Sequence, residues 1–107
     1  MRILDRYLLR EFVGYLGLLH ARQGRHDDAR RCLTSGEALL RSASDAFGLG
    51  VLLTSRAEAY QLAGEAAAAT ASVAEAATLA TEVGAGPASE IGLALARVRG
   101  LIATIRT

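Results

Sequence analysis

The chain has 107 residues, enough for one domain that buries about two-thirds of its unfolded surface and too few for a second domain. Its single cysteine, Cys32, excludes an internal disulfide. Its formal net charge of +1 is too small for the broad basic face that nucleic-acid binding requires, and the neighbouring pair Arg30 and Arg31 does not supply one.

The charges are distributed unevenly along the chain. Residues 1–41 carry +3, residues 42–90 carry −5 and residues 91–107 carry +3. Basic ends and an acidic middle would favour head-to-tail contacts between chains. Solvated helix faces of uneven composition explain the same pattern more simply.

The first predicted helix spans about residues 2–23. Its apolar residues recur at three- and four-residue steps, which is typical of one continuous apolar stripe: Ile3, Leu4, Tyr7, Leu8, Phe12, Tyr15, Leu16 and Leu19. The opening MRILDRYLLREF is similar to the start of lipopolysaccharide-export permeases, but those proteins continue into a membrane span. Here the longest nearly apolar run, residues 12–19, is much shorter than the roughly 20 residues that a span needs, and no signal-peptide cleavage region follows. We therefore expect a cytoplasmic protein without a membrane partner.

Gly24 predicts a tight turn into a second helix that runs from His26 to about residue 43, so residues 2–43 form a first helical hairpin. His20 and His26, with two neighbouring aspartates, are candidate metal ligands. They lie on opposite sides of the turn and lack the i, i+4 spacing of a helical zinc site, so we expect no metal. Cys32 occupies a helical position where a small packed residue is expected.

The third predicted helix begins at Asp45 or Ala46 and ends at Leu62, and the fourth covers about residues 65–83. Together they form a second hairpin over residues 45–83. The fourth helix is dominated by alanine, which favours helix but buries little area, so we expect it to be the weakest part of the core. Gly84 and Gly86 end it, and Pro87 suits the first turn of a fifth helix, residues 88–105, which would cover the second hairpin.

The chain resembles itself at a shift of 40 residues. Gly24 falls on Gly64 and Ala29 on Ala69, and similar residue types pair at other positions. Small residues let two helices approach closely, bulky residues fill the space beside them, and glycine permits the turn between them. The pattern predicts two related helical hairpins.

These residues resemble the tetratricopeptide repeat (TPR) family, whose hairpin has a small residue, a large residue, glycine, alanine, a large residue and a small residue in fixed register. The two matching sets are Gly17, His20, Gly24, Ala29, Leu33 and Gly36, and then Ala57, Tyr60, Gly64, Ala69, Val73 and Ala76. The resemblance covers about residues 10–103 and predicts an all-α domain, residues 1–107, with five helices stacked as two and a half antiparallel hairpins.

The chain also departs from the TPR pattern. Val13 and Leu53 replace its early tryptophan, Arg41 and Thr81 replace its closing proline, and the 40-residue period exceeds the usual 34. We therefore expect a long-repeat variant of the family.

Catalytic motifs are absent from the sequence. No GxSxG turn with a supporting histidine occurs, and neither a GxGxxG nor a phosphate-binding loop pattern is present. We therefore predict no catalysis, no cofactor and no nucleic-acid partner.

In the TPR family, the first helices of successive hairpins line a groove that receives peptides. Carried over by register, the resemblance implies groove residues at Leu18, Arg22, Thr54, Glu58, Gln61 and Val98. The lysines and asparagine with which some members hold a terminal carboxylate are absent from this chain. The implied groove is mixed and apolar, with Arg22 and Glu58 as its polar features, although surface or interhelix packing explains the same residues equally well.

Two functions follow as hypotheses. The first is a scaffold or docking module that binds a protein or peptide in this groove; its partner is not identified by the sequence. The alternative is a structural unit that forms a homodimer through its apolar ends or first helix. If the groove binds a partner, Arg22→Ala and Glu58→Ala should weaken binding without lowering the melting temperature.

Overall fold

The computed structural model describes the backbone of residues 3–106 and, among their side chains, those of residue 12 and residues 14–104. Residues 3–106 form five α-helices and no strand, packed antiparallel, which confirms the predicted all-α class. The helices are α1 (Ile3–Arg22), α2 (His26–Ser42), α3 (Ala46–Leu62), α4 (Ala66–Glu82) and α5 (Glu90–Arg106). The expected start of the first helix at residue 2 lies outside the described residues.

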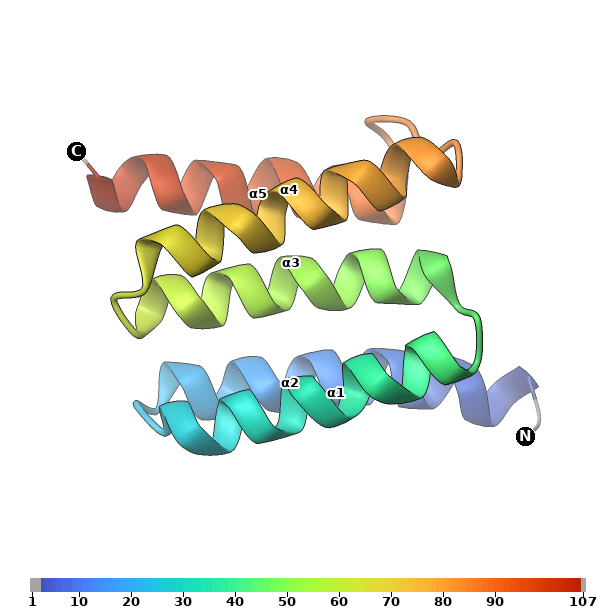
Figure 1. Cartoon of the computed structure of the whole chain (residues 1–107), viewed down its shortest axis with the longest axis horizontal. Helices are drawn as coiled ribbons and strands as arrows, with labels where there is room; N and C mark the ends of the chain where they lie inside the picture. Colours follow the sequence, from blue (N-terminus) through green and yellow to red (C-terminus); the bar gives the residue numbers. More distant parts are fainter. Residues whose placement is uncertain (1–2, 107) are drawn as a thin grey trace.

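Helix α3 is the centre of the molecule. It contacts each of the other four helices, while α1 pairs with α2 on one side of it and α4 pairs with α5 on the other. Figure 1 shows α1 behind α2 and α5 behind α4, with α3 between the two pairs. The expected fifth helix therefore packs on α3 and α4, where it covers the second hairpin.

The four turns between the helices repeat one backbone motif. Gly24, Ser44, Gly64 and Gly84 all have positive φ, of 78°, 55°, 80° and 70°. In each turn the next residue donates its N–H to a carbonyl five residues earlier, as from Arg25 to His20 at 2.9 Å, which is the bonding of a Schellman C-cap. The turn predicted at Gly24 is confirmed, and the 40-residue period consists of two similar helix–turn units of 20 residues.

Small residues bring the two helices of each hairpin together, as the sequence pattern predicted. Gly17 is buried, and a Cβ added to it would lie 2.6 Å from Leu33 Cγ, so a larger residue does not fit without movement. The corresponding Ala57 and the turn-following Ala69 are both 0% exposed. The alanine-rich α4 buries only small residues fully, so its contribution of apolar area is small.

The expected apolar stripe of the first helix needs correction. In α1, Phe12, Tyr15 and Leu19 are exposed rather than inward-facing, because the helix has apolar residues on two sides and only one side meets α2 and α3. Leu16 of the same stripe is half-buried, and Ile3, Leu4, Tyr7 and Leu8 lie outside the side chains that the structure describes. Two leucines of α5 are also exposed, Leu93 at 61% and Leu101 at 36%.

The start of α5 also differs from the prediction. The helix begins at Glu90, and Pro87 belongs to the preceding turn rather than to the first helical turn. Ser89 is the N-cap, since its Oγ accepts a hydrogen bond from the Gly92 N–H at 3.0 Å. The turn folds back so closely that a Cβ on Gly92 would clash with the carbonyl oxygen of Gly86. Serine capping therefore overrides the preference of proline for the first turn.

Candidate functional site

The six residues implied by the groove pattern lie on three helices. Leu18 and Arg22 belong to α1, Thr54, Glu58 and Gln61 to α3, and Val98 to α5. Helix α3 contacts both α1 and α5, and we call the side of the molecule where these three helices meet the α1–α3–α5 face. Among these six residues, the structure places Arg22 in contact with Glu58.

The six residues differ in how far their side chains are buried. Thr54 and Val98 are 2% and 0% exposed, and the Thr54 hydroxyl donates to the Val51 carbonyl at 2.6 Å within its own helix. Val98 packs in a cluster with Ala57 and Ile102. These two side chains lie beneath the surface, whereas Leu18 and Gln61 are half-buried and Arg22 is exposed.

The centre of the face is a buried carboxylate between two arginines. Glu58 Oε2 accepts hydrogen bonds from Arg22 Nη2 at 2.9 Å and from Arg22 Nε at 3.2 Å. Arg97 Nη2 lies 2.7 Å from Glu58 Oε1 as an ion pair without the alignment of a hydrogen bond. The Glu58 side chain is only 7% exposed, whereas those of Arg22 and Arg97 are 56% and 49% exposed. Helix α3 is therefore joined to both α1 and α5 by one carboxylate.

Arg97 was not among the predicted site residues. Its position corresponds by the 40-residue register to Gly17 and Ala57, which are small because a second helix packs on them. The register therefore predicts that residue 97 faces a following helix, not Glu58. Only the packing of α5 on α3 reveals the contact.

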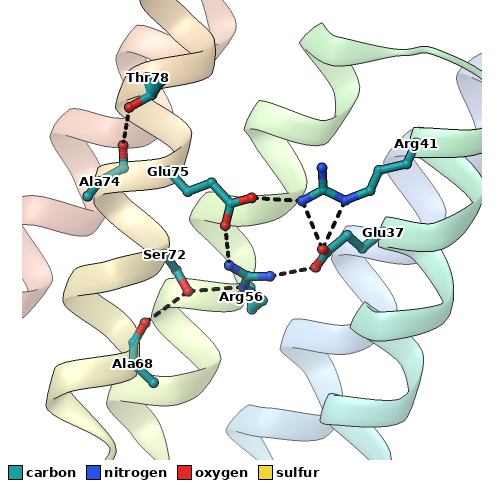
Figure 2. A network of polar contacts seen from close by, with 8 residues as sticks. All are labelled: Glu37, Arg41, Arg56, Ala68, Ser72, Ala74, Glu75 and Thr78. Atoms are coloured by element: carbon teal, nitrogen blue, oxygen red, sulfur yellow. Dashed lines mark hydrogen bonds and ion pairs between the residues drawn. The ribbon is translucent and has the colours of Figure 1, made fainter.

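A second network lies on the side of α3 that meets α2 and α4, and Figure 2 shows its members. Arg56 donates to Glu37 at 2.5 Å, to Glu75 at 2.8 Å and to the Ser72 hydroxyl at 3.0 Å. Arg41 also bridges the two glutamates, with a bond of 2.7 Å to Glu75. Burial of Glu75 opposes its ionisation, but hydrogen bonds from Arg41 and Arg56 outweigh this and lower the pKa of that carboxyl.

These contacts give another explanation for the uneven charge. The acidic residues of the middle segment meet arginines of the flanking segments inside one chain: Arg22 with Glu58, Arg97 with Glu58, Arg30 with Glu65 and Arg41 with Glu75. Charge that is separated along the sequence is thus paired in space, so the uneven pattern does not require contact between chains.

The histidines and the cysteine do not form a reactive cluster. Over the described part of the chain, no three His, Cys, Asp or Glu side chains lie close enough together to hold a metal ion. Burial raises the pKa of the Cys32 thiol, which disfavours the nucleophilic thiolate. A cavity beside His26 and Tyr60 has a volume of about 20 Å³, room for a single water molecule.

Comparison of the chain with protein-family models, with curated proteins and with solved structures found no match in any of the three. None of the helices, over the residues that are described, has both the length and the hydropathy needed to span a membrane.

Proposed function

We propose that this domain is a TPR-like helical repeat that binds a protein or peptide partner on its α1–α3–α5 face, without catalysis of its own. Support for the repeat comes from its two hairpins, which place the same residue types in the same structural roles. Gly24 and Gly64 have φ of 78° and 80°, and Ala29 and Ala69 are 2% and 0% exposed. Equivalent roles at a 40-residue shift are what a repeat requires.

The observation that carries the binding proposal is the arrangement of Arg22 and Arg97 around Glu58. One carboxylate neutralises one of the two guanidinium charges, so the centre of the face keeps a surplus positive charge. Both arginine side chains are about half exposed and lie beside a carboxylate that the fold buries, and hydrogen bonds to this carboxylate orient Arg22. Pre-oriented guanidinium donors are well suited to bind a further carboxylate.

The proposed partner is therefore a peptide segment with an acidic side chain or a terminal carboxylate, flanked by apolar residues. The apolar part would lie against the half-buried Leu18 and the exposed Leu101 on the same helices. Rigid helices hold these groups in place, which reduces the ordering cost of binding.

The test selects peptides from a random display library on the wild-type chain and measures their affinity for Arg22→Gln. We expect the selected peptides to share an acidic residue, and Arg22→Gln to weaken their binding about tenfold, the effect of one charge-assisted contact. Arg31→Gln is the matched control, because Arg31 is an exposed arginine on α2, away from this face. Replacing the acidic residue of the peptide by its amide should reproduce the loss.

Glu58 is unsuitable for this test, contrary to the expectation from the sequence. It is buried between two arginines, so Glu58→Ala would lower stability as well as binding. Arg22→Gln leaves Arg97 paired with Glu58, and its melting temperature should stay close to that of the wild type. Failure to select any peptide, or equal binding by wild type and Arg22→Gln, would overturn the proposal.

A further inference from the structure

Two hollows lie between α4 and α5, and Arg99 lines both of them. The first, of about 340 Å³, is lined by Thr70, Val73, Arg99, Ile102 and Ala103. The second, of about 350 Å³, extends to the turn before α5, and its walls include the small residues Ala77, Thr81 and Ala96. We call the two hollows together the α4–α5 groove, whose walls are mostly small or apolar side chains.

The first hollow has a counterpart 40 residues earlier, between α2 and α3. Four of its lining residues correspond by register to residues around the cavity beside His26 and Tyr60, namely Thr70 to Arg30, Val73 to Leu33, Arg99 to Ala59 and Ala103 to Ala63. That cavity has a volume of only about 20 Å³. Glu65, at the start of α4, also lines it and forms an ion pair with Arg30 at 3.4 Å. Helix α4 therefore closes this part of the junction between α2 and α3.

The second hollow corresponds to the network of Figure 2. By register, its small wall residues Ala77, Thr81 and Ala96 correspond to Glu37, Arg41 and Arg56. In that network α4 supplies Glu75, which accepts hydrogen bonds from Arg41 at 2.7 Å and from Arg56 at 2.8 Å. At both places α4 thus meets an arginine of the junction with a carboxylate. Among the described residues, no helix covers the corresponding junction between α4 and α5.

Exposure shows the same difference between the two junctions. Leu53 of α3 is 0% exposed and belongs to a core cluster with Ala76 and Ala80 of α4, whereas its register counterpart Leu93 of α5 is 61% exposed. Arg99 is also exposed, and none of the side chains that the structure describes forms a hydrogen bond or ion pair with it. The α4–α5 groove therefore combines apolar walls with one positive charge that has no counterion there.

We propose that the α4–α5 groove binds an amphipathic α-helix of a partner protein, which lies on α5 as α4 lies on α3 and places a carboxylate on Arg99. The template is α4, in which Glu65 and Glu75 are separated by about 15 Å of helix, so the partner helix needs about three turns. An acidic residue near its start pairs with Arg99, as Glu65 pairs with Arg30. Larger apolar residues follow, because the second hollow is open where charged side chains fill the first junction. This surface is separate from the α1–α3–α5 face.

The probe is a synthetic peptide with the sequence of residues 64–83, in which Ser72→Leu and Glu75→Leu replace the two residues that contact Arg56 and the glutamate at 65 is kept. Fluorescence anisotropy measures its affinity for the 107-residue chain. We expect saturable binding that Arg99→Gln weakens about tenfold and that Arg31→Gln, on the exposed side of α2, leaves unchanged. A peptide with Glu65→Arg should bind the Arg99→Glu chain more tightly than the wild type. Absence of binding, or equal effects of the two glutamine variants, overturns the proposal.

The place of binding is tested with Ala96→Trp, which fills the second hollow and should abolish binding of the peptide. Ala71→Trp is the matched control, because Ala71 is an exposed alanine of α4 that lines neither hollow. Circular dichroism checks that both variants keep their helices. Binding that survives Ala96→Trp would mean that the peptide lies elsewhere, and would overturn the proposal. Sedimentation velocity of the chain alone should show a monomer; a dimer that Ala96→Trp dissociates would make a second copy the occupant instead of a partner helix.

Discussion

The two hairpins, α1 with α2 and α3 with α4, have similar backbones but different residues in their seams. The seam of a hairpin is the contact between its two helices. In the first hairpin Gly17 leaves the space that Leu33 occupies, and an added Cβ would lie 2.6 Å from Leu33 Cγ. In the second, Ala57 and Val73 occupy the same two positions and share a cluster. Compared with the first hairpin, the second has one more side-chain carbon on its first helix and one fewer on its second helix, so the total is the same. The repeat therefore conserves the summed volume of a seam rather than its individual residues.

The hairpins also differ in charge. Glu58 of the central helix corresponds in register to the apolar Leu18 and Val98, and Arg56 corresponds to Leu16 and Ala96. Because α3 contacts all four other helices, its charged residues are the ones that find partners on both sides. The apolar pattern sets the shape of a hairpin, while the neighbours of each helix determine which of its positions tolerate charge.

The largest expected effect comes from a substitution that disrupts the packing between α1 and α2 in the seam of the first hairpin. Gly17→Ala should destabilise the domain by about 2 kcal/mol, because the added methyl overpacks against Leu33. Leu33→Val alone should cost about 1 kcal/mol through lost burial. The double variant recreates the Ala–Val seam of the second hairpin and should return to near wild-type stability, as measured by urea unfolding.

Gly100→Ala is the control for the seam experiment. Gly100 lies inside α5, and a Cβ there would meet nothing within 4 Å, so alanine should raise stability by about 0.5–1 kcal/mol through helix propensity. If Gly17→Ala behaved like Gly100→Ala, or if Leu33→Val failed to rescue it, the idea of a conserved seam volume would be wrong.

A smaller effect concerns the turns. The turns within the hairpins have Gly24 and Gly64, whereas the turn between the hairpins has Ser44, the only non-glycine of positive φ among the described residues, at 55°. Ser44→Gly should stabilise the domain by about 0.5 kcal/mol, since relief of the left-handed conformation exceeds the added entropy of the unfolded chain.

The reverse exchange, Gly64→Ser, should destabilise by a similar amount, and thermal unfolding measures both changes. The prediction fails if the two substitutions shift the melting temperature in the same direction. Agreement would show that the turns within and between hairpins are one motif despite their different residues.

The sequence predicts the helices and turns of this structure better than it predicts the contacts between helices. The helices and turns were predictable because Gly24, Gly64 and Gly84 mark helix ends and the apolar period is regular between them. The exposure of Phe12 and Tyr15 was not, because periodicity identifies apolar sides of a helix without identifying what covers each one. The expected groove positions came from the register of the TPR resemblance, but their burial and the contact of Glu58 with Arg97 depend on how α5 packs on α3.

The smallest expected effect concerns pH and the network on the α2 and α4 side of α3. Glu75 has a pKa below its ordinary value because the hydrogen bonds from Arg41 and Arg56 outweigh its burial. A lowered pKa in the folded state means that the stabilisation is present above the unfolded pKa and is lost as the pH falls through the folded pKa. The stability difference between wild type and Arg56→Gln should therefore be largest near pH 7 and shrink as the pH is lowered from about 5 to 3.

The pH-dependent part of this difference should be on the order of a few tenths of a kcal/mol, since Glu75 is 40% exposed and solvent screens its contacts. Arg31→Gln is the matched control, because Arg31 is 74% exposed and its hydrogen bond lowers the pKa of the surface residue Asp28. In 1 M salt the control difference should vanish, whereas part of the Arg56 difference should remain, because the Arg56 side chain is only 22% exposed. Equal salt sensitivity of the two variants would mean that the network on α3 behaves as an ordinary surface pair, and that position in the stack gives its charges no special environment.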